Sequence, residues 1–142
     1  MPERSDVELL EELLARENRL VSAYEAALRR DAIDASLGET LRDHEREHVR
    51  GIEQALEGRG PRNPRANVPS PQLTAALRSR ASFARFAMEL EGQTVTAYTE
   101  SVPKIRDAGL RQPLGSIMAC GEAHVVQLRN SLAERSLVNY PE

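Results

Sequence analysis

The sequence predicts an all-α protein built as a four-helix bundle. Aromatic residues make up only 4% of its 142 residues and tryptophan is absent. Ala, Leu, Arg and Glu, which are strong helix formers, dominate the composition. Apolar residues recur every three or four positions through long stretches between helix breakers, which is typical of amphipathic helices. The breakers leave four such stretches, so we expect four long helices.

The first two helices are expected over about residues 6–30 and 35–57. Ser5 or Asp6 can cap the N-terminus of the first helix, and the second begins near Ala35 or Ser36 and ends at Gly58. Each has an apolar stripe with charged or polar residues at its centre. The first stripe is Leu10, Leu14, Glu17, Val21, Tyr24 and Leu28, and the second is Leu37, Leu41, Glu45, His48, Ile52 and Ala55.

The other two helices are expected over about residues 72–102 and 111–136. The third helix should stop before Pro103, because proline disfavours a helical conformation of the residue before it. Polar residues again interrupt both apolar stripes. The third stripe is Leu77, Ala81, Ala84, Met88, Glu91, Val95, Tyr98 and Val102, and the fourth is Leu114, Ile117, Gly121, His124, Leu128 and Ser131.

The lengths of the connections predict how the helices are arranged. Short connections join the first helix to the second and the third to the fourth, so each pair should form an antiparallel hairpin. Residues 58–71 are rich in proline and glycine and cannot be helical. Extended, this crossover could cover roughly 45 Å, more than the length of a twenty-residue helix at about 30 Å. We therefore expect one domain of two hairpins joined by a long crossover.

An internal repeat marks the centre of the predicted bundle. The segment from Glu17 to Tyr24 recurs from Glu91 to Tyr98, and His48 in the second helix aligns with His124 in the fourth. Carboxylates and imidazoles thus occupy positions where a bundle normally buries leucine. Burying charge requires compensation, and a metal ion is the usual partner of Glu and His together.

This pattern, with Glu on the first and third helices, Glu-x-x-His on the second and a long crossover, resembles bacterial members of the ferritin-like superfamily over residues 6–135. The resemblance implies a di-iron or di-manganese carboxylate site and an activity of oxidase, peroxide-handling or iron-buffering type. It assigns no catalytic residue. Tyr24 and Tyr98 are placed for hydrogen bonds to ligands on the partner helix. The implied metal ligands are Glu17, Glu45, His48, Glu91 and His124.

The fourth helix departs from the family pattern. Gly121 stands where the family has a glutamate three residues before His124. Glu122 is rotated by about 100° from that position and should point away. Cys120 lies closer in angle to His124 and could supply a thiolate. The resemblance therefore implies an asymmetric site, with one complete ligand set and one that lacks a carboxylate.

Two other interpretations fit the same sequence. One is a degenerate, metal-free bundle that acts as a dimerising or partner-binding module. The other is a mononuclear zinc or manganese site at Glu17, Glu45 and His48. His44 lies one position off the stripe, and we expect it at the surface.

The composition also excludes several classes of function. A net charge of −3 and an isoelectric point near 5.7 do not favour nucleic-acid binding. The single cysteine excludes an intramolecular disulfide, and no apolar run predicts a signal peptide or a membrane span. We expect a cytoplasmic homo-oligomer, in the simplest case a dimer.

Overall fold

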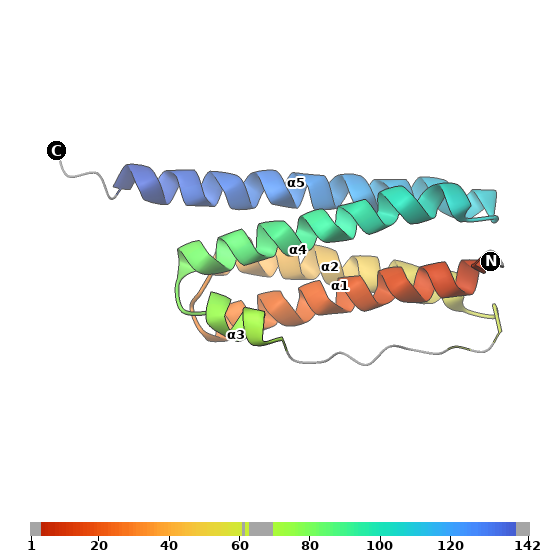
Figure 1. Cartoon of the computed structure of the whole chain (residues 1–142), viewed down its shortest axis with the longest axis horizontal. Coiled ribbons are helices and arrows are strands. Elements are labelled where there is room, and N and C mark those ends of the chain that lie inside the picture. Colours follow the sequence, from red (N-terminus) through yellow and green to blue (C-terminus); the bar gives the residue numbers. More distant parts are fainter. Residues whose placement is uncertain (1–3, 61, 63–69, 139–142) are drawn as a thin grey trace.

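The computed structural model describes residues 4–60, 62 and 70–138, and these form a bundle of four long helices (Figure 1). The long helices are α1 (Asp6–Arg29), α2 (Ala35–Leu56), α4 (Arg80–Ser101) and α5 (Ala108–Val138). Two short elements, α3 (Pro71–Ala76) and the 3₁₀ helix η1 (Val102–Lys104), precede and follow α4. No strand occurs in the described ranges. The predicted all-α four-helix bundle is confirmed.

The bundle consists of two helical hairpins. Helix α1 packs mainly on α2, and α4 packs mainly on α5. The hairpins meet along α1 and α4, which lie side by side and run in opposite directions (Figure 1). Of the predicted crossover at 58–71, residues 61 and 63–69 lie outside the described residues. No helix in the described part of the chain is long and apolar enough to cross a membrane.

Capping by Ser5 fixes the start of α1. The Ser5 hydroxyl accepts a hydrogen bond from the Glu8 backbone N–H, and the Glu8 carboxylate accepts one from the Ser5 N–H. Asp6, the other predicted cap, has a different role. Its carboxylate accepts hydrogen bonds from the backbone N–H groups of Arg106 and Asp107, at 2.8 and 3.0 Å. The start of α1 is thereby tied to the connection before α5.

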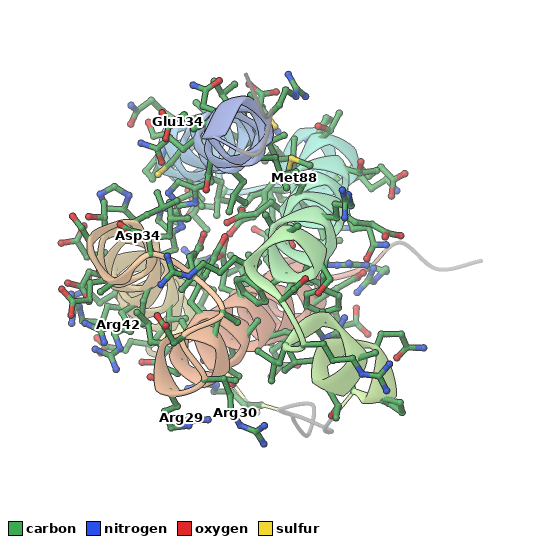
Figure 2. The ribbon with its side chains drawn as sticks, turned by 90° about the vertical axis from the view of Figure 1, so that its left-hand side faces the viewer. Arg29, Arg30, Asp34, Arg42, Met88 and Glu134 are labelled. Atoms are coloured by element: carbon green, nitrogen blue, oxygen red, sulfur yellow. The ribbon has the colours of Figure 1, made fainter. Side chains whose placement is uncertain are left out.

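The predicted third helix over 72–102 is wrong at its start, because the chain forms two helices there. Ser79 caps α4 through a reciprocal pair of hydrogen bonds with Ser82, and Ser70 caps the separate helix α3. The serine hydroxyls accept hydrogen bonds from backbone N–H groups that would donate to carbonyl groups of the preceding turn in a continuous helix. Viewed along the bundle, α3 lies outside the four long helices (Figure 2). The buried face of α4 is also centred differently, since Met88 and Val95 are only half-buried.

The core consists of two apolar clusters with polar residues between them. One cluster includes Leu20, Leu41, Phe83 and Leu128, and the other, towards the opposite end of the bundle, includes Leu10, Ile52, Ala97 and Leu114. On each long helix a buried polar residue separates the two clusters. These residues are Glu17 on α1, Glu45 on α2, Glu91 on α4 and His124 on α5.

Two glycines of α2 test how closely the first hairpin is packed. A Cβ atom on Gly38 would lie 2.7 Å from both Leu28 Cδ2 and Ile33 Cγ2, whereas one on Gly51 would meet nothing within 4 Å. Gly38→Ala should destabilise the protein by about 1–3 kcal/mol through overpacking. The matched control Gly51→Ala should stabilise it by about 0.5–1 kcal/mol, because alanine favours the helix. Urea unfolding measures both changes, and equal effects would contradict the close packing at Gly38.

Candidate metal centre

The structure brings all five predicted ligands together between the two apolar clusters. Glu17, Glu45, Glu91 and His124 are each only 1% exposed, and the side chain of His48 is 11% exposed. The four long helices all contribute to the group. Ionised carboxylates in such a dry environment require a compensating partner.

Glu45 lies between the two histidines and contacts both. Its Oε2 lies 2.9 Å from His48 Nδ1, and its Oε1 lies 2.8 Å from His124 Nδ1. His48 Nδ1 also faces Glu17 Oε2 at 3.6 Å, and His124 Nδ1 lies 3.0 Å from Glu91 Oε1. Two groups of three ligands result, and they share Glu45.

Each tyrosine of the repeat contacts the glutamate of the other hairpin. The Tyr24 hydroxyl on α1 donates a hydrogen bond to Glu91 Oε1 at 2.7 Å, and the Tyr98 hydroxyl on α4 donates one to Glu17 Oε1 at 2.5 Å. The expected hydrogen bonds to glutamates of the partner helix are therefore present. Burial and the neighbouring carboxylates raise the pKa of both tyrosines well above the usual value, so both remain donors.

The missing carboxylate of α5 leaves little empty space. A Cβ on Gly121 would lie 3.0 Å from Val95 Cγ2 and 3.6 Å from Glu91 Oε2. Val95 and Glu91 therefore close over the position. Glu122 is exposed, as expected from its rotation around the helix. The second ligand group thus has Glu45, Glu91 and His124 and no further carboxylate from α5.

The prediction that His44 is a surface residue is wrong. His44 is half-buried, and its Nδ1 lies 3.0 Å from His124 Nε2. Cys120 Sγ lies 3.4 Å from the same nitrogen of His124. The stripe of α2 faces α1, but His124 of α5 also approaches α2 and partly covers the side of α2 that carries His44. The four-residue spacing of Cys120 and His124 in the sequence predicted that these two side chains lie close together. Nothing in the residue spacing of α2 predicted that His44 joins them.

The protons of the metal-free centre are distributed unequally. Burial raises the pKa of Glu45 to about 8, and the neighbouring Glu17 adds to this shift. Although burial opposes ionisation, contacts with Glu45 and His48 hold the pKa of Glu17 below its usual value. Burial also opposes the charge on the imidazoles, but the carboxylates outweigh it and raise the pKa of His48 to about 11 and of His124 to about 10. Without metal, protons link the carboxylates and imidazoles.

The donor set fits a hard divalent metal ion. In each group of three the ligand atoms lie within 4.8 Å of one another. Glu17 Oε2 is buried and accepts no hydrogen bond. Among the described residues, only histidines form ion pairs with Glu17, Glu45 and Glu91. Carboxylate and imidazole ligands suit iron and manganese, and zinc can use them as well.

Comparison with known families agrees with the helical fold. A family model described as a ferritin-like domain matches residues 5–134. The chain belongs to the ferritin-like domain family. Searches of curated proteins and of solved structures gave no match. The family match thus supports the ferritin-like fold and does not specify the metal ligands or the metal.

The raised pKa values predict how the stability of the metal-free ferritin-like protein depends on pH. A group whose pKa is raised by folding stabilises the protein fully below its unfolded pKa and loses this contribution as the pH rises through its folded pKa. Glu45 loses its contribution between pH 4.5 and about pH 8. His48 loses its contribution between pH 6.5 and about pH 11, and His124 between pH 6.5 and about pH 10. The unfolding temperature should therefore fall from about pH 6 to about pH 9.

Thermal unfolding in the presence of a chelator measures this dependence. Glu45→Gln removes one titrating group and a carboxylate partner of both histidines, so its stability should vary less over the same range. Folding lowers the pKa of Glu17, so its effect on stability has the opposite sign. Its stabilising contribution is lost only below about pH 4.5, as the pH falls. A wild-type protein whose stability rises towards pH 9 would contradict the proton distribution.

Proposed function

We propose that this ferritin-like protein binds two iron or manganese ions at an asymmetric centre and acts in oxygen or peroxide chemistry or in iron buffering. The observation that carries the proposal is the position of Glu45, whose two oxygens serve two different histidines. A carboxylate between two imidazole groups is suited to bridge two metal ions.

The residues of the chain assign a role to each side of the centre. Glu17, Glu45 and His48 would hold the first ion, and Glu91 and His124, with the shared Glu45, would hold the second. Bound iron or manganese supplies Lewis-acid and redox chemistry. Tyr98 and Tyr24 orient the carboxylates of the first and second groups through their hydrogen bonds. Each ion would have three ligands, but Glu45 lies on the same helix as His48 and α5 adds no carboxylate beside His124. The second ion would therefore depend on a carboxylate from the first group and should bind more weakly than the first.

One observation favours the alternative of a metal-free module that dimerises or binds a partner. Hydrogen bonds link Tyr24, Glu91, His124, Glu45 and His48 in a continuous network without any ion. Such a network can stabilise a core by itself. Glu17 Oε2 favours the metal centre over this alternative. This buried oxygen accepts no hydrogen bond, and its ion-pair partner His48 Nδ1 lies 3.6 Å away, so the oxygen is only partly compensated without an ion. The homodimer itself stays a prediction.

Anaerobic titration with Fe(II), followed by removal of unbound metal, tests the proposal. The wild-type protein should retain about two equivalents, the second more weakly than the first, because ligand loss lowers affinity. Glu45→Gln should weaken the binding of both ions, since Glu45 belongs to both ligand groups. The matched control is Glu47→Gln, an exposed glutamate of the same helix, which should behave as wild type.

Variants of the unshared glutamates distinguish the remaining outcomes. Glu17→Gln should abolish the stronger site and leave the weaker one, and Glu91→Gln should do the opposite. Retention of one equivalent that depends on Glu17 and not on Glu91 would indicate the mononuclear site. No retained iron or manganese in the folded wild-type protein would establish the metal-free alternative.

Restoring the missing carboxylate should strengthen the second site. Gly121→Glu combined with Val95→Ala supplies the glutamate and removes the methyl group that a Cβ at position 121 would approach. We expect the affinity of the second ion to rise by at least about tenfold. Without metal this variant should be less stable, because another carboxylate is buried near Glu91. Gly121→Gln with Val95→Ala has nearly the same shape without the charge, and equal metal binding by both variants would contradict the assignment of Gly121 as the missing ligand position.

A further inference from the structure

A second cluster of metal-binding side chains lies on the other side of His124. Its Nδ1 faces the carboxylates, whereas its Nε2 faces His44 on α2 and Cys120 on its own helix. The three donor atoms are His44 Nδ1, Cys120 Sγ and His124 Nε2, and they lie within 4.8 Å of one another. No carboxylate belongs to this group, so its chemistry differs from that of the glutamate-rich centre.

The distances in this cluster match those between ligands of a tetrahedral zinc ion. Zinc bonds of about 2.0–2.1 Å to nitrogen and about 2.3 Å to sulfur place tetrahedral ligands about 3.3 Å apart for two nitrogens and about 3.6 Å apart for nitrogen and sulfur. The two nitrogens here are 3.0 Å apart, and the sulfur lies 3.4 Å from His124 Nε2 and 4.0 Å from His44 Nδ1. The distances between the donor atoms therefore fit zinc, and binding requires that the facing rings turn so that both nitrogens point at the ion.

The surroundings of His124 favour a metal on its Nε2. Glu45 and Glu91 both accept hydrogen bonds at its Nδ1, at 2.8 and 3.0 Å. A histidine that donates one N–H to a carboxylate and binds metal through its other nitrogen is the usual arrangement at zinc sites. His44 and Cys120 are half-buried, so the cluster is reached from the surface while His124 is held rigidly beneath it.

We propose that His44, Cys120 and His124 form a separate binding site for zinc or a similar thiolate-preferring ion. Two imidazoles and a thiolate are ligands that such ions prefer, and three protein ligands leave a fourth position for water. Binding releases the thiol proton and the proton between the two imidazoles.

The contact between His44 and His124 shows which hydrogen bond the ion would replace. The rings of His44 and His124 are nearly coplanar, with an angle of 8° between them and 5.3 Å between their centroids. With their facing nitrogens 3.0 Å apart, the rings share one hydrogen in an edge-to-edge contact. A metal ion takes the place of this hydrogen, and His44, the less buried partner, turns to direct its nitrogen at the ion.

The new site shares His124 with the carboxylate centre. The hydrogen bonds that favour a metal on Nε2 need a proton on Nδ1, so this site competes with a second ion held through Nδ1. The test therefore uses the two residues that the sites do not share. Cobalt(II) is the probe, because a cobalt–thiolate bond gives a charge-transfer absorption that carboxylate and histidine ligands do not give. The reduced wild-type protein should show this absorption, and zinc should displace the cobalt. Cys120→Ala should lose the absorption, and its zinc affinity should fall by more than about 100-fold, since even the loss of an outer-shell partner costs roughly 10–100-fold.

A matched control keeps the number of thiols constant. Ala119→Cys combined with Cys120→Ala moves the thiol to an exposed neighbouring position and should bind zinc as weakly as Cys120→Ala. His44→Ala is a second, independent variant that should retain the thiol and still lose tight zinc binding. Circular dichroism checks that each variant is folded.

The outcomes for the two metal sites can be told apart. Glu17→Gln, which lowers iron binding at the carboxylate centre, should keep the cobalt–thiolate absorption, because Glu17 contacts neither His44 nor Cys120. The site therefore stands even if the carboxylate centre proves to be metal-free. Cobalt or zinc binding that is unchanged in both Cys120→Ala and His44→Ala, or no thiolate absorption in the wild-type protein, would overturn the proposal.

Discussion

The contacts of Glu45 with His48 and His124 are the interaction on which the rest of the structure depends. A carboxylate that is 1% exposed would be strongly destabilising without partners, and Glu45 finds one on its own helix and one on α5. These contacts hold together two helices that otherwise touch little, since α2 and α5 make far fewer contacts than α1 with α2 or α4 with α5. Apolar clusters on both sides exclude water and strengthen every electrostatic contact between them.

The internal repeat also explains how the two hairpins are joined. Each repeat supplies a glutamate and, two turns later, a tyrosine, and the antiparallel approach of α1 and α4 places each tyrosine beside the glutamate of the other repeat. The same two hydrogen bonds hold the hairpins in register and orient two candidate metal ligands. The two halves of the repeat nevertheless differ, because α2 has Glu45 three residues before its histidine and α5 has Gly121 at the matching position.

The accuracy of the sequence predictions depended on whether the relevant forces were local. Helices α1 and α2 were predicted to within one residue at each end, since the cap at Ser5, the glycine after α2 and the continuous stripes are local signals. The third predicted helix failed at Ser79, where competition between a cap and a continued helix was not visible in the apolar spacing. The five central residues were predicted to lie together because each interrupts an apolar stripe, and the structure places them together. Their role as metal ligands stays a proposal.

The sequence by itself determined the four helices, their pairing into hairpins and the polar centre between two apolar regions. These follow from periodicity, helix breakers and the length of connections, which act along the chain. Only the tertiary structure decided which atoms meet: that Glu45 serves both histidines, that each tyrosine contacts the glutamate of the other hairpin, and that His44 reaches His124 beside Cys120. Such contacts depend on the rotation of each helix against two neighbours at once, and a pattern read along one helix does not contain that rotation.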